Sequence, residues 1–204
     1  MKTLKWIGLT FLVLILASLP LIFEGDIPKE IVDEKYSNSA SKFLITDKGA
    51  RIHYRDHGIK GSPTVVLVHG AMASLHTWEP WVEILSSKYR IVTLDLQGHG
   101  LTGKVPQNAF GPDNFTETIN AVVNELGIER FVLGGNSMGG GATWRYTLNH
   151  PDRVVAMILV ASVGLSSWRK TDQQDRERST GDTPIGFYLL GQPWFRAVAR
   201  YLDP

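Results

Sequence analysis

The chain has 204 residues, of which 43% are apolar, so it can bury one hydrophobic core, and we expect one folded domain. Its net charge is +1, with basic and acidic residues interspersed, which argues against a nucleic-acid partner because such a surface normally carries a basic stripe. The chain has no cysteine, which excludes a disulfide framework and a thiolate metal site, and the sequence predicts no metal and no cofactor.

The N-terminus carries an apolar segment of membrane-spanning length. Residues 6–23 contain no charge and follow a short region, residues 1–5, that holds Lys2 and Lys5. A helix of that length is roughly 27 Å long, close to the ~30 Å hydrocarbon core of a bilayer. The lysines before the segment and the acidic residues after it predict a single-pass anchor with the folded body on the extracytoplasmic side. The alternative is a cleaved signal peptide, with Ala17-Ser18 as the best small-residue pair, which would give a secreted protein.

Residues 24–41 are polar and are expected to form a linker, after which strand and helix patterns alternate. Two short strands around the turn at residues 47–50 predict a β-hairpin. Apolar runs predict buried strands, and the strand at 154–161 is expected to be buried on both faces. Thr77 and a capping box at 114–117 predict the starts of two helices. The expected strands are residues 43–46, 51–55, 64–68, 90–94, 131–133 and 154–161, and the helices begin near Thr77, at Asn114 and at Met138.

This alternation predicts an α/β fold, a mostly parallel twisted sheet flanked by helices, because βαβ units with right-handed crossovers build parallel sheets. In such sheets the chemistry lies beyond the C-terminal ends of the strands. Three motifs follow strands in this chain: His69-Gly70-Ala71, residues 95–100, and the glycine-rich stretch around Ser137. We therefore expect them to meet at one edge.

The stretch Gly135-Asn136-Ser137-Met138-Gly139 has the form G-x-S-x-G between an expected strand and an expected helix, which is a nucleophile elbow. A serine at the tip of such a turn exposes its hydroxyl, and the flanking glycines permit close packing. The backbone N–H of Met138, at the start of the helix, can point at a negative oxygen. Ser137 is therefore the candidate nucleophile.

Together the three motifs make residues 43–165 resemble the α/β-hydrolase superfamily. The resemblance implies that Ser137 attacks a carbonyl carbon and that the N–H groups of Met138 and Ala71 form the oxyanion hole, with Met72 as an alternative to Ala71. Gln97 stands where the superfamily usually has proline in its D-x-P-G-x-G motif, a departure expected to affect loop rigidity more than chemistry. The sequence G-N-S-M-G-G around Ser137 is also similar to the corresponding motif of hydrolases that cleave carbon-carbon bonds in ring-fission products.

The other polar residues near these motifs are expected to have structural roles. His69 should hold its loop by hydrogen bonds, and Asp95 should organise the loop that it begins. The remaining histidines before the elbow are expected to be surface or loop residues; they are His53, His57, His76 and His99.

The superfamily places its acid and then its histidine after the serine. Here the one histidine after Ser137 is His150, at the far end of the expected helix and thus a poor base. Two further strands are expected after residue 161, whereas residues 165–204 are similar to the start of a helical cap. The sequence thus predicts an incomplete hydrolase core, residues 42–164, and a 204-residue chain that is inactive alone.

The leading functional hypothesis is a membrane-anchored serine hydrolase that acts on a small ester-like or apolar carbonyl substrate through Ser137. A carbon-carbon bond hydrolase of the same fold is one alternative. A catalytically inactive, membrane-tethered binding module is the other.

Overall fold

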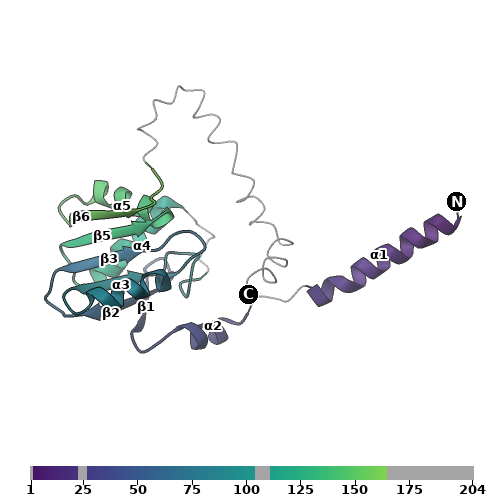
Figure 1. The fold of residues 1–204 in the computed structure, drawn as a ribbon, viewed down its shortest axis with the longest axis horizontal. Coiled ribbons are helices and arrows are strands. Elements are labelled where there is room, and N and C mark those ends of the chain that lie inside the picture. The colour runs from purple at the N-terminus through teal and green to yellow at the C-terminus, as the bar shows by residue number, and fades with distance from the viewer. Residues whose placement is uncertain (1, 23–26, 104–110, 165–204) are drawn as a thin grey trace, which may run out of the picture. The chain divides into compact units, whose positions relative to one another are not determined.

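The computed structural model describes residues 2–22, 27–103 and 111–164 (Figure 1). The chain divides into two compact units, and the smaller one contains the helix α1, Lys2–Ile22. Across the described ranges no helix meets the length and apolarity required to cross a bilayer. The expected anchor therefore stays a prediction, and the expected cap at residues 165–204 lies outside the described residues.

The larger unit, Lys29–Ser166, is built on a six-stranded sheet in the order β1-β2-β4-β3-β5-β6 (Figure 1). β1 pairs antiparallel with β2, and β2 antiparallel with β4, whereas the pairs β4–β3, β3–β5 and β5–β6 are parallel. The predicted hairpin and mostly parallel sheet are confirmed. The strands are β1 Ser41–Ile45, β2 Arg51–Gly58, β3 Thr64–Val68, β4 Arg90–Leu94, β5 Phe131–Asn136 and β6 Val154–Val160.

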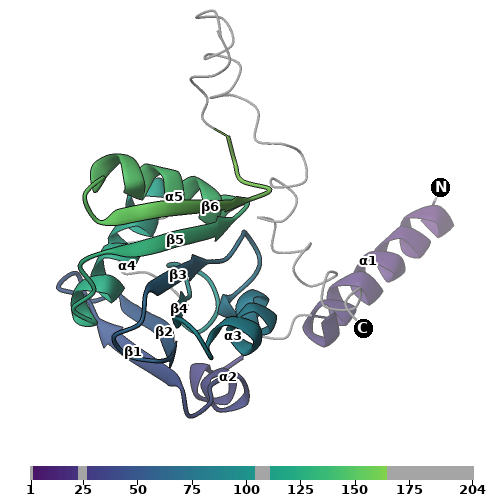
Figure 2. The same ribbon diagram turned by 60° about the vertical axis from the view of Figure 1, so that its left-hand side comes forward.

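Helices cover both faces of this sheet because the central strands are apolar on both sides. Val66 and Val68 of β3 belong to a core that includes buried residues of α4, Pro112–Glu125, and α5, Met138–Asn149. The intervening Val65 and Leu67 pack with Trp78 at the end of the short 3₁₀ helix η1, Leu75–Trp78, and with α3, Glu79–Leu85. Figure 2 shows α3 and α4 on opposite sides of the sheet.

The stretch expected to be a linker contains a helix, α2, Lys29–Tyr36. Glu30 in its first turn and Lys35 in its last turn complement the helix dipole. Asp33 accepts hydrogen bonds from the Arg51 guanidinium of β2, at 2.9 and 3.3 Å. The segment is therefore bound to the sheet instead of being a free spacer.

Two predicted helix starts are each shifted by two residues, and Thr77 does not cap α3. Thr77 lies within η1, and Trp78 is the residue that precedes α3. α4 begins at Pro112, two residues before the capping box, because proline is well suited to the first helical turn, where its missing N–H costs nothing.

The predicted burial of β6 on both faces was also wrong. Val155, Met157 and Leu159 are 55%, 46% and 46% exposed. Among the described residues β6 is the last strand of the sheet and pairs only with β5, so these alternate side chains have no covering layer there.

Candidate active site

The sheet brings the three motifs together at one edge, as expected from its topology. β3 pairs in parallel with both β4 and β5, so the loops after Val68, Leu94 and Asn136 leave the sheet side by side. A Cβ atom added to Gly70 would lie 2.7 Å from Asn136 Oδ1 and 3.4 Å from Ser137 Cβ. Because Gly70 has no side chain, the loop after β3 can lie directly against Ser137.

Ser137 occupies the turn between β5 and α5, with φ 48° and ψ −111°. This conformation is unfavourable for a residue with a side chain and is typical of strained functional positions. Three backbone hydrogen bonds hold it: its N–H donates to Val160 O at 2.9 Å, and its carbonyl accepts from the N–H groups of Gly141 and Val163 at 3.1 and 3.0 Å. The end of β6, the segment after it and the first turn of α5 therefore hold the strained turn in place.

The candidate oxyanion donors come from the two segments that flank this serine. Met138 is the first residue of α5, where unpaired N–H groups and the helix dipole favour a negative charge. Ala71 follows Gly70, and Met72 has φ 56° and is 73% exposed. A Cβ atom on Gly139 would lie 2.4 Å from both Val68 O and His69 O, so the start of α5 packs directly on the end of β3.

Asp95 organises the second loop from a fully buried position. Its carboxylate accepts hydrogen bonds from His53 Nδ1 at 2.7 Å and from the N–H groups of Leu75 and Leu101 at 2.7 and 2.9 Å. Burial alone would raise the pKa of the Asp95 carboxyl, but these donors lower it below its usual value. Asp95 therefore stays ionised and ties three segments together.

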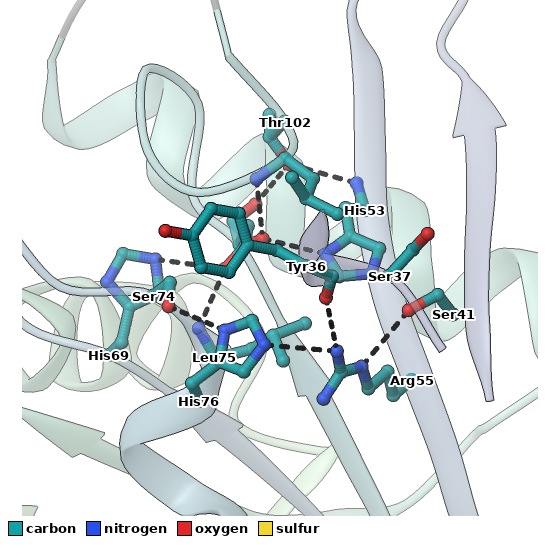
Figure 3. Close-up of polar contacts among 12 residues, drawn as sticks. Tyr36, Ser37, Ser41, His53, Arg55, His69, Ser74, Leu75, His76 and Thr102 are labelled. Atoms are coloured by element: carbon teal, nitrogen blue, oxygen red, sulfur yellow. Dashed lines mark hydrogen bonds and ion pairs between the residues drawn. The ribbon is translucent and has the colours of Figure 1, made fainter. Parts of the chain in front are cut away.

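His53 differs most from its expected place. It is a fully buried residue of β2, not a surface or loop residue, and its ring also stacks on Phe43 at a centroid distance of 4.9 Å. Figure 3 shows it beside Thr102, whose hydroxyl accepts from the His53 N–H at 2.9 Å. The pairing with Asp95 stabilises the loop and leaves His53 buried away from solvent.

His69 holds its loop by hydrogen bonds, as expected. Its Nδ1–H donates to Gly70 O at 2.6 Å, and its Nε2 accepts from the Leu96 N–H at 3.0 Å. Burial lowers the pKa of His69, which keeps the ring neutral and allows it to donate and accept at once. It joins the first loop to the second.

Arg55 is a second buried group that the sequence did not reveal, with 2% of its surface exposed. Its guanidinium donates to Tyr36 O at 2.9 Å and to His76 Nε2 at 3.1 Å (Figure 3). It also donates to Glu79 Oε1 at 2.9 Å. It therefore connects β2 to the end of α2 and to the start of α3.

The alternation of residue types in β2 concealed both groups. His53 and Arg55 alternate with the buried Ile52 and Tyr54, a pattern that ordinarily assigns the polar residues to solvent. Here the polar face is covered, because segments distant in the sequence supply Asp95 and Glu79 as partners.

The remaining histidines lie apart from Ser137 or in partly exposed positions. His57 and His76 are half-buried on the α3 side, and His99 is half-buried, with its ring 5.3 Å from that of His69. His150 follows the last residue of α5, and its ring contacts Tyr146 at 4.4 Å. A helix of 12 residues is about 18 Å long, so His150 lies at the opposite end from Ser137.

Known proteins similar to this chain are hydrolases. Epoxide hydrolase 4 of Homo sapiens is 31% identical over 117 residues, which are 57% of this chain and 32% of that protein. The 2-hydroxy-6-oxononadienedioate/2-hydroxy-6-oxononatrienedioate hydrolase of Escherichia coli O139:H28 is 34% identical over 132 residues, 60% of this chain and 44% of that protein. The matches thus span between a third and a half of the length of these relatives.

Among solved structures, a membrane phospholipase A described as a bacterial virulence factor superposes with a TM-score of 0.63 and 26% identity, covering 100% of this chain and 64% of that one. A family model described as the alpha/beta hydrolase fold matches residues 63–182. With the elbow, the sheet order and this match in agreement, the chain belongs to the α/β-hydrolase family.

Proposed function

We propose that the protein is a membrane-tethered serine hydrolase that cleaves an ester through Ser137. The observation that carries this proposal is the strained Ser137 between β5 and α5, against Gly70 and at the N-terminus of a helix. Its Oγ would attack the ester carbonyl carbon, and the N–H groups of Met138 and Ala71 would donate to the oxygen that becomes negative. The alcohol leaves, and water then hydrolyses the acyl-serine.

The attack also needs a base to take the Ser137 proton. The described histidines are engaged or placed elsewhere. His53 is bonded to Asp95, His69 to Gly70 and Leu96, His76 to Ser74 and Arg55, and His99 Nδ1 contacts Gln97 O at 3.2 Å. His57 lies on the α3 side of the sheet, and His150 lies at the far end of α5. The acid and base of the triad are therefore not assigned among the described residues. We expect the 204-residue chain alone to turn over esters slowly.

The membrane tether is proposed from the charge-free residues 6–23 behind Lys2 and Lys5. The similarity to a membrane phospholipase A supports both this tether and an ester of a lipid as the substrate. The body would lie on the extracytoplasmic side, and cleavage of the segment would give a secreted enzyme. Washing isolated membranes with alkaline carbonate tests the tether, because full release of the protein is incompatible with a retained anchor.

A carbon-carbon bond hydrolase is the second candidate. The motif sequence around Ser137 and the 34% identity to the Escherichia coli hydrolase named above favour this second activity. Ester turnover in phospholipid vesicles, compared with turnover of a 2-hydroxy-6-oxo-dienoate, separates the two activities.

The catalytic role of Ser137 is tested in membranes from cells that make the protein, with a fluorophosphonate probe and an activated ester. Ser137→Ala should abolish labelling and, where a base completes the site, reduce turnover by about 10³-fold or more, because a nucleophile and its base act as a unit. The control is Ser87→Ala, an exposed serine, which should label as the unaltered protein does. Equal labelling after Ser137→Ala would remove Ser137 from the mechanism. If the folded, unaltered protein does not label, the inactive binding module is the better description.

A further inference from the structure

Two arginines of β2 attach α2 to the sheet. The Arg51 guanidinium binds the Asp33 carboxylate through two hydrogen bonds, Nη1–Oδ1 at 3.3 Å and Nη2–Oδ2 at 2.9 Å. Arg55 Nη2 donates to the carbonyl oxygen of Tyr36, the last residue of α2, at 2.9 Å (Figure 3). Arg55 is 2% exposed and always charged, so the loss of one of its acceptors is costly. α2 is thus held at its middle and at its C-terminal end.

Arg51 also holds the second loop, residues 95–103. Its Nη1 donates to Leu101 O at 2.9 Å, so one guanidinium nitrogen serves both this loop and α2. The N–H group of Leu101 donates to the Asp95 carboxylate at 2.9 Å. Both backbone polar groups of Leu101 are therefore fixed, one by Asp95 and the other by the arginine that binds α2.

Arg55 reaches the first loop through a histidine. Its Nη2 also donates to His76 Nε2 at 3.1 Å (Figure 3). Nε2 accepts when the ring proton is on Nδ1, which lies 2.9 Å from Ser74 Oγ and donates to it. Ser74 follows Met72 by two residues and Ala71 by three. The contact of Arg55 with α2 is therefore linked to the segment that offers N–H groups to the oxyanion.

We propose that Arg51 and Arg55 are positioning residues that couple the docking of α2 to the geometry of the loops beside Ser137. When α2 leaves the sheet, each guanidinium loses an acceptor, and its hydrogen bond to a loop loses its fixed direction. The loops then open more often, which weakens the donors proposed for the oxyanion. The consequence for Ser137 rests on the proposed function, whereas the coupling between α2 and the loops does not. α2 also follows the proposed membrane segment, residues 6–23, so a displacement of α2 at the membrane would lower the reactivity of Ser137.

The test is amide hydrogen exchange of the full chain in detergent micelles. Asp33→Asn should speed exchange in residues 70–76 and 96–103 about three- to tenfold, although Asp33 belongs to α2 and to neither loop, and Asp33→Glu should largely restore the slow exchange. The matched control is Glu34→Gln, at an exposed glutamate of the same helix, which should change neither loop. Unchanged exchange of both loops in Asp33→Asn would overturn the proposal. An equal increase in β5 would overturn it as well, because the variant would then destabilise the whole sheet.

Two further variants separate the two links. Arg51→Gln should speed exchange of residues 96–103 more than that of residues 70–76, and His76→Ala should do the reverse, because each variant removes one link. If each variant affects both loops equally, the assignment of one arginine to each loop is wrong.

Labelling by a fluorophosphonate probe, in membranes from cells that make the protein, measures the consequence for Ser137. Asp33→Asn should lower the maximal labelling rate at least about threefold relative to Glu34→Gln, with the half-saturating probe concentration unchanged, because the loops supply donors to the transition state. Equal labelling rates together with faster loop exchange would show that the loops do not position the site. If the unaltered protein does not label, the proposed function fails, and the exchange measurements still decide the coupling.

Discussion

A single carboxylate, Asp95, joins segments from three parts of the chain. It accepts from the His53 ring and from two backbone N–H groups, those of Leu75 and Leu101, and all three donors are buried with it. Removing one acceptor oxygen would leave a buried donor facing another donor. The position should therefore tolerate no isosteric change.

We predict that Asp95→Asn lowers the free energy of unfolding by about 2–4 kcal/mol, because the amide nitrogen must face one of these N–H donors. Urea unfolding followed by tryptophan fluorescence measures the change. Asp152→Asn, at an exposed aspartate, is the control and should stay within about 0.5 kcal/mol of the unaltered protein. A similar small effect for Asp95→Asn would mean that the loop does not depend on this carboxylate.

Ser137 shows the opposite relation between stability and function. Its φ of 48° with ψ −111° is accessible to glycine at little cost but is unfavourable for any residue with a Cβ atom. We predict that Ser137→Gly raises the free energy of unfolding by about 1–2 kcal/mol and abolishes labelling of the site. Ser137→Ala keeps the Cβ atom and should lose labelling without that gain. If the two variants are equally stable, the turn is not strained in solution.

Within the described part of the chain, β6 is an edge strand of the sheet and carries a row of exposed apolar side chains. Val155, Met157 and Leu159 form its exposed row, and the strand carries no charge and no proline. Such a strand can pair with a second chain through its free backbone groups.

We predict that Met157→Lys reduces concentration-dependent association of the protein, because a charge on an edge strand opposes pairing with another copy. Size-exclusion chromatography over a range of concentrations measures it. Ile84→Lys is the matched control: it adds the same charge at a residue 72% exposed on α3, and it should leave association unchanged. Equal effects of the two variants would assign association to net charge and not to β6.

The same elements show how far sequence reasoning reaches. β3 and β4 have the predicted bounds, Thr64–Val68 and Arg90–Leu94, because continuous apolar runs are typical of strands covered on both faces. The turn that carries Ser137 was also predicted, since glycine spacing encodes it locally. Local sequence patterns therefore predict an element correctly when residues within that element determine its structure.

Burial of polar residues could not be predicted in this way. His53, Arg55 and Gln97 are buried because distant segments cover them: Asp95 lies 42 residues after His53, Glu79 lies 24 after Arg55, and Asn114 lies 17 after Gln97. A period-two pattern or a loop motif contains no information about such partners. The helix α2 was missed for a related reason, because its polar composition is favourable only through contacts such as that of Asp33 with Arg51.

At the scale of the whole molecule, three aspartates link stability to pH. Burial raises the pKa of Asp33, Asp56 and Asp95, but hydrogen-bonded partners lower each below its usual value. The principal partners are Lys29 and Arg51 for Asp33, Arg90 for Asp56 and His53 for Asp95.

A carboxyl whose pKa is lowered by folding stabilises the protein above its unfolded pKa of about 3.9, and that contribution is lost as the pH falls through the folded pKa. We predict that the urea midpoint begins to fall below about pH 6.5, because burial lowers the pKa of His69 and only the unfolded chain then takes up that proton, and that it falls more steeply below about pH 5, where the aspartates contribute. In Asp95→Asn the fall should be shallower, because one of the linked groups is absent. A flat midpoint down to pH 3 would contradict the linkage.

We also predict that the purified 204-residue chain reacts with a fluorophosphonate probe at least about 10³-fold more slowly than a serine hydrolase with a complete triad, because no base is assigned to Ser137 among the described residues. The half-time of labelling measures this, with Ser137→Ala as the background. Rapid labelling at Ser137 would show that the chain contains a base that the described geometry does not identify.

The position of β3 in the middle of the sheet has a consequence for synthesis on the ribosome. β3 pairs with β4, about 20 residues later in the chain, but its other neighbour is β5, which begins about 60 residues after Val68. At roughly 5–20 residues per second, one side of β3 stays unpaired for roughly 3–12 s during translation, with its five apolar or β-branched residues exposed. Formation of this sheet is thus limited by the arrival of β5, and the nascent chain offers chaperones that bind extended apolar segments a window of several seconds.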